Sequence, residues 1–345
     1  VAQSQPADFT SLAEALARAQ PAATIEILDD GIYDAIAIND ARWRGLRIQS
    51  PRHAALRSST SSAPLLAING VPDVVISGLR LLAGPEQHAL WIGGAVPGLR
   101  IENVQCVHAV GAQCGIAVID QAVGAEKTPA IVRDCTFADD YIGLAVLGRS
   151  NSPVAWLRVE QCRFRMHGKG VTVTIENAAE HISFAHCVLA GGGGASGIHI
   201  GPKSRDVSVV NNTFFQTSDW VAFDTDAVVP GVSLRRNLVL ESKYMLHEGS
   251  ELPRVIDVCL SENWWESAGD ANGDQVKAVC APRDPLPQLP VVSRDAASAA
   301  FLQPQAGSAL TGLKEADGAT YIGAIPPPGD APPGNPPPTA ERQAD

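Results

Sequence analysis

The stretch Val159-Glu-Gln-Cys162-Arg-Phe164 is one copy of a six-residue phrase that recurs along the chain. In this phrase the first and sixth residues are apolar and the second and third are mostly polar. The fourth is Cys, Asn or an apolar residue, and the fifth varies. Its fourth residue recurs after 25, 31, 27, 25, 25, 25 and 26 residues. The other copies are Ile76-Ser-Gly-Leu79-Arg-Leu81, Ile101-Glu-Asn-Val104-Gln-Cys106, Val132-Arg-Asp-Cys135-Thr-Phe137, Phe184-Ala-His-Cys187-Val-Leu189, Val209-Val-Asn-Asn212-Thr-Phe214, Leu234-Arg-Arg-Asn237-Leu-Val239 and Leu260-Ser-Glu-Asn263-Trp-Trp265.

A further apolar stretch follows most copies and predicts another short strand in each repeat. No segment between the strands has helical periodicity long enough for a crossover helix, and the leucine-rich-repeat consensus is absent. The sequence therefore predicts an all-β protein, a right-handed parallel β-helix in which each coil pairs with the next at about 4.8 Å. The additional strands are Gly115-Ile-Ala-Val-Ile, Ile142-Gly-Leu-Ala-Val, Gly170-Val-Thr-Val-Thr, Gly197-Ile-His-Ile and Trp220-Val-Ala-Phe.

The composition agrees with many short strands and frequent turns. Of the 345 residues, 45% are hydrophobic and only 5% are aromatic, with 31 Gly and 25 Pro. Such a chain is globular, and its interior must be filled by small and branched side chains. The hydrophobic fraction is high enough for one continuous core.

The two ends differ from the repeat. Ser11-Leu-Ala-Glu14 is a capping box that predicts a short helix through about Ala19, placed to cover the first coil. We expect a cap at residues 1–23, the β-helix at 24–265, a closing segment at 266–325 and a Pro-rich disordered tail or linker at 326–345.

The opening of the chain resembles that of pectate-lyase-like β-helix proteins. They often begin with a short helix, an apolar strand and a Gly-Xaa-Tyr turn such as Gly31-Ile-Tyr33. The resemblance covers roughly residues 8 to 265 and is one of fold. The segment from Ala306-Gly-Ser through Tyr321-Ile-Gly-Ala-Ile325 also resembles a closing segment seen after many bacterial β-helices.

Net charge narrows the range of partners. The formal charge is −11, and no Lys/Arg run is present, so the chain lacks the electrostatic footprint of a nucleic-acid binder. An acidic polysaccharide would require a local basic patch or a bridging cation, whereas a neutral glycan would not.

No apolar run is long enough to span a membrane, so we expect no direct membrane insertion within this chain. The chain begins at Val1 without a Met, so we expect that an upstream segment has been removed. The extracytoplasmic location that we expect, which is periplasmic, secreted or an anchored ectodomain, belongs to the binding-module hypothesis below and not to this observation.

One column of the repeat is occupied by Cys135, Cys162 and Cys187 and is continued by asparagines. Small soft side chains fill a narrow interior, so we interpret the cysteines as packing residues without disulfides. Asn212, Asn237 and Asn263 are expected to hydrogen-bond along the rod, without implying an activity. Cys259 and Cys280 lie outside the column and are the one pair to test for a disulfide.

The candidate site lies on the outer surface of the additional strands. We assign Ala117, Ala145, Thr172, His199 and Ala222 to one outward row and Ile119, Leu147, Thr174, Gly201 and Asp224 to the next, which predicts a shallow trough. Catalytic candidates are His199, Lys203, Asp224 and Asp226. Ligand-binding candidates are Trp91, His167, Lys169, Thr172 and Trp220, the indoles because an exposed ring can stack on a sugar.

Two acidic groups could hold a metal. Asp224 and Asp226 share a strand face at i and i+2, which suits calcium or acid/base chemistry but equally suits the end of a strand. Asp270-Ala-Asn272-Gly-Asp274 has calcium-loop spacing at its first three positions, but Gln275 stands where such a loop requires Gly. The polygalacturonase pattern is incomplete: Asp139-Asp140 and His167-Gly168-Lys169 occur, but neither Asn-Thr-Asp nor Arg-Ile-Lys does.

Two classes of function follow. The favoured hypothesis is a non-catalytic carbohydrate-binding module of a larger bacterial protein. Such modules resemble the β-helix domains of planctomycete-type proteins, some of which are the sensor region of a membrane serine/threonine kinase. The alternative is a polysaccharide lyase or glycoside hydrolase acting on a polymer that lies along the β-helix. Fold alone does not decide between them.

Overall fold

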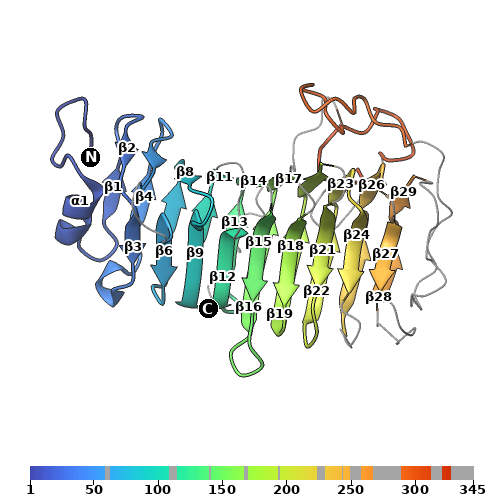
Figure 1. Cartoon of the computed structure of the whole chain (residues 1–345), viewed down its shortest axis with the longest axis horizontal. Coiled ribbons are helices and arrows are strands. Elements are labelled where there is room, and N and C mark those ends of the chain that lie inside the picture. Colours follow the sequence, from blue (N-terminus) through green and yellow to red (C-terminus); the bar gives the residue numbers. More distant parts are fainter. Residues whose placement is uncertain are drawn as a thin grey trace, which may run out of the picture.

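In a computed structural model, the structure describes residues 1–58, 63–108, 115–139, 141–166, 170–192, 195–223, 230–242, 244–248, 258–266, 289–311 and 321–327. Parallel strands stack coil upon coil along one axis, from β1 at the N-terminal end to β29 (Figure 1). The right-handed parallel β-helix predicted from the repeat is confirmed. Each complete coil has three strands, because the six-residue phrase itself contains two strands separated by a corner.

The strands form three faces that run the length of the rod. Face I contains β1 Thr24–Glu26, β4 Arg47–Gln49, β7 Val75–Ser77, β10 Arg100–Glu102, β13 Ala130–Arg133, β16 Val154–Glu160, β19 Ala179–Ala185, β22 Arg205–Val210, β25 Val232–Arg235 and β28 Val258–Ser261. Face II contains β2 Ile32–Tyr33, β5 Ala55–Leu56, β8 Arg80–Ala83, β11 Gln105–His108, β14 Thr136–Asp139, β17 Arg163–Met166, β20 Val188–Gly191, β23 Thr213–Phe215, β26 Leu238–Leu240 and β29 Trp264–Trp265. Face III contains β3 Ile36–Ile38, β6 Leu66–Asn69, β9 Leu90–Ala95, β12 Gly115–Val123, β15 Ile142–Leu147, β18 Val171–Glu176, β21 Ser196–Ile200, β24 Asp219–Phe223 and β27 Tyr244–Glu248.

The corner between faces I and II explains why the third residue of the phrase is polar or Gly. This residue has a positive φ in every copy, a conformation that Gly, Asn and Asp tolerate best. At Gly78 the need for Gly is steric as well, because a Cβ there would lie 2.3 Å from the carbonyl oxygen of Ser50. The corner residues are Gly78, Asn103, Asp134, Gln161, His186, Asn211, Arg236 and Glu262.

The fourth residue of the phrase lies just inside this corner. The buried Asn212 accepts a hydrogen bond at its side-chain oxygen from the backbone N–H of Cys187, at 2.8 Å, and Asn237 does the same for Asn212, at 2.9 Å. The predicted asparagine ladder is thus confirmed. Cys135, Cys162 and Cys187 are buried free thiols whose Sγ atoms lie within hydrogen-bond distance of backbone carbonyls.

The cap covers the N-terminal end of the core. Helix α1, Leu12–Arg18, begins where Ser11 accepts a hydrogen bond from the backbone N–H of Glu14, as the capping box predicts. Leu12, Ala15 and Leu16 are buried against the first coil, and a short 3-10 helix, Ala41–Trp43, adds Trp43 to the same cluster. This packing shields the hydrophobic end of the solenoid from solvent.

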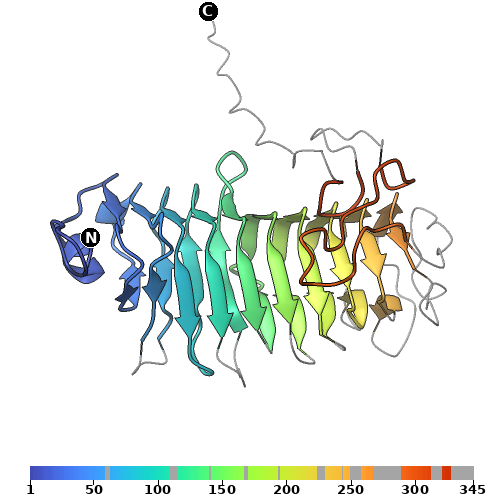
Figure 2. The same ribbon diagram turned by 90° about the horizontal axis from the view of Figure 1, so that it is seen from above.

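The described part of the closing segment, 289–311 and 321–327, lies on face II over β23 and β26 (Figures 1 and 2). Leu289, Val291, Leu302, Leu310 and Ile322 pack against outward apolar side chains of that face. Phe301 meets Phe215 edge to face, with ring centroids 5.3 Å apart. Among the described residues, no helix is long and apolar enough to span a bilayer.

Candidate functional site

The outer surface of face III carries one continuous file of side chains. Strand pairing places Ala145, Thr174, His199 and Ala222 on successive coils. Toward the N-terminal end the file continues through Val118, Trp91 and Ala67. We refer to the outer surface along this file as the trough. Its side chains are mostly small, and Val118, Ala145, Thr174 and Ala222 are at most 7% exposed, whereas Trp91 and His199 are half-buried.

The predicted rows contain a register error. Ala117 and Ile119 are buried at 0% and 1% exposure and point into the core, and Val118 takes the outward place. The chain turns from face II to face III over two consecutive inward residues, Ile116 and Ala117, so simple alternation fails at this corner. The same offset places Thr174 in the row that was predicted for Thr172.

Two predicted ligand-binding residues are therefore wrong. Thr172 and Trp220 are both fully buried, at 0% exposure, and cannot touch a ligand on the outer surface. The Trp220 ring packs edge to face on Phe214, with centroids 5.6 Å apart. The preceding coil has Gly197 at the corresponding position, where a Cβ would lie 2.9 Å from Phe214.

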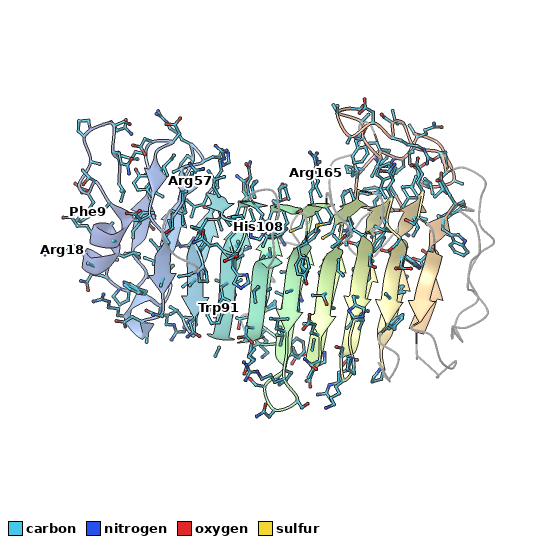
Figure 3. The ribbon with its side chains drawn as sticks, in the orientation of Figure 1. Phe9, Arg18, Arg57, Trp91, His108 and Arg165 are labelled. Carbon is cyan, nitrogen blue, oxygen red and sulfur yellow. The ribbon has the colours of Figure 1, made fainter. Side chains whose placement is uncertain are left out.

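Trp91 is the indole that does reach the surface of face III, where it is half-buried (Figure 3). Its six-membered ring lies over Gly93, because a Cβ on Gly93 would be 2.3 Å from Trp91 Cη2. Strand pairing puts Asn69 and Asp120 on either side of Gly93, on the neighbouring coils. An aromatic platform is thus flanked by an amide and a carboxylate, two groups that the sequence alone did not connect with it.

Thr174 and His199 form the polar end of the trough. Thr174 Oγ1 and His199 Nδ1 lie 3.4 Å apart on adjacent coils. At the edge of the same face, Asp219 accepts hydrogen bonds from the hydroxyls of Ser196, at 3.1 Å, and Ser218, at 2.9 Å. Thr174 is only 3% exposed, so the groups of this end that a polar ligand could reach are the half-buried His199 imidazole and the Ser196 and Ser218 hydroxyls.

Lys203 lies away from His199. It follows β21 in the turn toward face I, is exposed, and donates from Nζ to Ser150 Oγ at 2.9 Å. The structure does not bring these two catalytic candidates together on the trough.

The remaining candidates, Asp224, Asp226, His167, Lys169, Asp270, Asn272, Asp274 and Cys280, lie outside the described residues, as does the side chain of Cys259. Within the residues that are described, no group of three or more His, Cys, Asp or Glu side chains could hold a metal.

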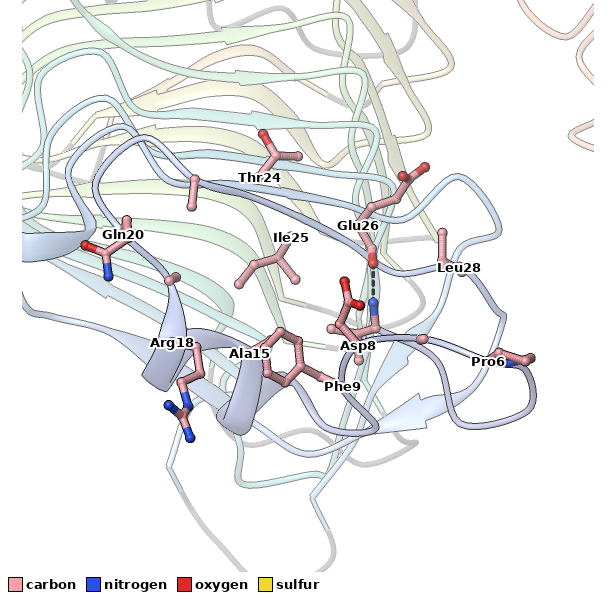
Figure 4. A pocket seen from close by; sticks show the side chains of 14 residues that line it. Pro6, Asp8, Phe9, Ala15, Arg18, Gln20, Thr24, Ile25, Glu26 and Leu28 are labelled. Carbon is pink, nitrogen blue, oxygen red and sulfur yellow. Dashed lines mark hydrogen bonds between the residues drawn. The ribbon is translucent and has the colours of Figure 1, made fainter.

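Two cavities of about 590 Å³ each lie elsewhere. One separates the cap from the first coil, between Phe9 and Ala15 on one side and Ile25 on the other (Figure 4). Beside it the N-terminal amine of Val1 donates to the carbonyl of Glu26 at 2.6 Å. This cavity belongs to the junction between the cap and the solenoid.

The second cavity lies where the closing segment meets the corner of faces I and II. Asp134, Gln161, Arg163 and His186 line it from the coils and Gln303 from the closing segment. Burial raises the pKa of the Asp134 carboxyl, Arg133 opposes the rise, and the carboxylates of Glu102 and Glu160 add to it. Only the return of the closing segment creates this cavity, so the repeat gave no signal of it.

Comparison with known proteins bears on the fold. The sequence matches no known protein family and no curated protein. The crystal structure of the pectate lyase Pel9A is 12% identical, with a TM-score of 0.57 over 92% of this chain and 91% of that one. The chain therefore has the pectate-lyase-like parallel β-helix fold.

Two further structures are more distant. The catalytic domain of a GH87 α-1,3-glucanase is 10% identical, with a TM-score of 0.33 over 76% of this chain and 64% of that one. The tailspike protein gp49 of Acinetobacter baumannii bacteriophage Fri1, a capsular polysaccharide depolymerase, is 10% identical, with a TM-score of 0.38 over 76% and 56%. At these TM-scores neither structure bears on the function of this chain.

Proposed function

We propose that this protein is a non-catalytic carbohydrate-binding module that holds an extended glycan along the trough of face III. The observation that carries the proposal is the Trp91 ring laid over Gly93 in the same file as Thr174 and His199. An indole presents a flat apolar face that suits the C–H face of a sugar ring. Asn69 and Asp120, on the neighbouring coils, can bond to the hydroxyl groups at the rim of such a ring.

The dimensions suit a linear polymer. Trp91 and His199 are separated by four coil steps, or about 19 Å at about 4.8 Å per step. An oligosaccharide of several units would span that distance. The shared fold with a pectate lyase supports a polysaccharide partner, and a partner of that kind supports an extracytoplasmic setting, as in a sensor region or secreted protein.

The test is glycan-array binding with wild-type protein and two tryptophan variants. Trp91→Ala should weaken binding about tenfold, because it removes the stacking face. Trp156→Ala is the matched control, since Trp156 is also half-buried but lies on face I, stacked on His181 with centroids 4.0 Å apart. Equal loss in both variants, or none in Trp91→Ala, would remove face III as the binding surface.

A second measurement separates binding from catalysis. The protein is incubated with pectins, alginates, glycosaminoglycans and neutral glucans, with and without calcium. We expect bound polymer and no turnover. Release of reducing ends or of a 4,5-unsaturated product would replace the module hypothesis with the lyase or hydrolase alternative, for which Asp224 and Asp226 remain the candidate acids.

A further inference from the structure

The outer surface of face II has two halves with different coverings. The closing segment covers the C-terminal half, where Val188, Phe215, Leu238 and Leu240 pack beneath it. The coils from β5 to β17 form a half that lies outside the apolar contact with the closing segment, although Thr136 and Arg163 at its C-terminal edge line a cavity together with Gln303 of that segment (Figure 1). We call it the open half, or the arginine face; its outward residues are Ala55, Arg57, Arg80, Leu82, Gln105, Val107, Thr136, Ala138, Arg163 and Arg165.

Strand pairing arranges these residues in two files, each with two arginines. One file runs Leu82, Val107, Ala138, Arg165 by strand pairing, and Arg57, which directly follows β5, continues it at the N-terminal end, so three apolar side chains lie between two cations. The other runs Ala55, Arg80, Gln105, Thr136, Arg163, of which Ala55 is buried. Figure 3 shows Arg57 and Arg165 on the same side of the rod. At about 4.8 Å per coil, the Arg57 and Arg165 positions are about 19 Å apart.

The positive charge of this face is not neutralised by the described residues. Arg57, Arg80, Arg163 and Arg165 are exposed, and none forms an ion pair within the described part of the chain. None of the outward side chains that the structure describes on these strands is a carboxylate. Asp34, one coil earlier in the Arg57 file, precedes them.

Face I has the opposite pattern. There Arg133 bonds to Glu160 through Nε at 2.9 Å, and Arg205 bonds to Glu180 at 2.6 Å. The arginine face is thus a cationic surface on a chain of net charge −11.

The apolar centre of the face points to a polypeptide. Val107 is 37% exposed, one of the few large apolar side chains of the described residues to be so exposed. Its file continues directly into Ala190, Phe215 and Leu240, which the closing segment covers. The same file therefore already binds polypeptide over its second half. Exposed apolar surface rimmed by charge is typical of a protein-binding site.

The charges specify the partner. Over the covered half, the coils supply Glu241 and Glu266, and the closing segment supplies Arg294, whose Nη1 lies 3.0 and 2.9 Å from their carboxylate oxygens. Over the open half, the coils supply arginine, so the complementary segment must be acidic. A planar guanidinium pairs well with a carboxylate.

We propose that the arginine face binds an extended acidic segment of a partner polypeptide, with apolar residues at its centre and a carboxylate at each end. In an extended chain, side chains on one side recur every 6.6 Å or so, and six residues span about 20 Å. The best-matched pattern is therefore acid at positions one and seven, with apolar residues at three and five. This surface is distinct from the face III trough and does not depend on the proposed glycan binding.

The probe is a fluorescent, end-blocked peptide Glu-Ser-Leu-Ser-Leu-Ser-Glu, titrated by anisotropy against the full chain at low salt. A lysine-ended peptide, Lys-Ser-Leu-Ser-Leu-Ser-Lys, should bind at least about fivefold more weakly. The double variant Arg57→Gln/Arg165→Gln should weaken binding of the acidic peptide about fivefold, and Val107→Ser should also weaken it. Arg158→Gln is the matched control, because Arg158 is an exposed, outward arginine of β16 on face I.

Three outcomes would overturn the inference. The first is no preference of the wild type for the acidic peptide over the lysine-ended one. The second is equal weakening by Arg158→Gln. The third is that polygalacturonate, in the presence of EDTA, binds more tightly than the acidic peptide and loses its binding in the Arg57→Gln/Arg165→Gln variant. That result would make this face a glycan site. The face III proposal is tested by a different measurement, the loss of neutral-glycan binding in Trp91→Ala. A failure of the peptide experiment therefore leaves that proposal intact.

Discussion

Asn212 holds Cys187 in place: its side-chain oxygen accepts the backbone N–H of Cys187 at 2.8 Å, and its amide nitrogen donates to the carbonyl of Phe184 at 2.9 Å. A cysteine column and an asparagine ladder therefore join at this contact. The amide side chain takes over hydrogen bonds that the tight corner between faces I and II leaves unmade in the backbone.

The first prediction concerns this contact. Asn212→Ala leaves the N–H of Cys187 and the carbonyl of Phe184 buried without these partners, which should destabilise the fold by about 2 to 4 kcal/mol. Asn151→Ala, at an exposed turn position, should change stability by less than about 0.5 kcal/mol. Urea unfolding measures both. Similar midpoints for the two variants would show that the ladder contributes little.

The second prediction concerns the buried thiols. Burial raises the pKa of Cys106, Cys135 and Cys162 well above the usual range, so little reactive thiolate forms at neutral pH. Iodoacetamide labelling followed by peptide mass spectrometry should leave these three unmodified in the native protein and modify them in guanidinium. Native labelling at the denatured rate would contradict the packing role.

The third prediction concerns the N-terminal anchor. The buried Asp29 accepts hydrogen bonds from Tyr33 Oη at 2.6 Å and from the backbone N–H of Gln3 at 2.7 Å. Burial alone would raise the pKa of Asp29, but these bonds lower it overall. Asp29→Ala should cost about 2 kcal/mol and expose residues 1–5 to protease, whereas Asp30→Ala, at an exposed site, should do neither. Identical proteolysis patterns for the two variants would argue against the anchor.

The fourth prediction concerns pH. Burial alone would raise the pKa of Glu266, but hydrogen bonds from Arg294 and the backbone of Leu289 lower it below its usual 4.5. The folded pKa is thus lower than the unfolded one, so the contribution to stability is present above about pH 4.5 and is lost as the pH falls through the folded pKa. Between about pH 6 and pH 3, Tm should fall further for the wild type than for Glu266→Gln. Glu176→Gln, a control at an exposed site, should show the same dependence of Tm on pH as the wild type. The same dependence in all three proteins would refute the prediction.

The fifth prediction tests how Trp91 is positioned. In Gly93→Ala the new Cβ would lie 2.3 Å from Trp91 Cη2, so the indole must swing off the strand. Glycan binding should fall about fivefold while the unfolding midpoint changes little. Gly84→Ala is the control, because nothing lies within 4 Å of its Cβ position. Unchanged affinity in Gly93→Ala would mean that the flat orientation is not what binds sugar.

The period of the phrase determined the β-helix, because residues one coil apart must stack when parallel strands pair in register. The same period placed the Cys and Asn column inside a corner, and the capping box at Ser11 placed the first helix. Within face III it also correctly assigned His199 and Ala222 to one outward file.

Tertiary structure alone decided the rest. Alternation could not show that Ile116 and Ala117 both point inward at a corner. Because of such corners, Thr172 and Trp220 are core residues, while Val118 belongs to the outward file. Nor could local sequence reveal that residues 289–311 and 321–327 return to cover one half of face II and leave Arg163 and Arg165 exposed on the other. Side-chain direction at a bend and long-range coverage depend on contacts between residues far apart in the chain, and a repeat of about 25 residues encodes only the contacts between neighbouring coils.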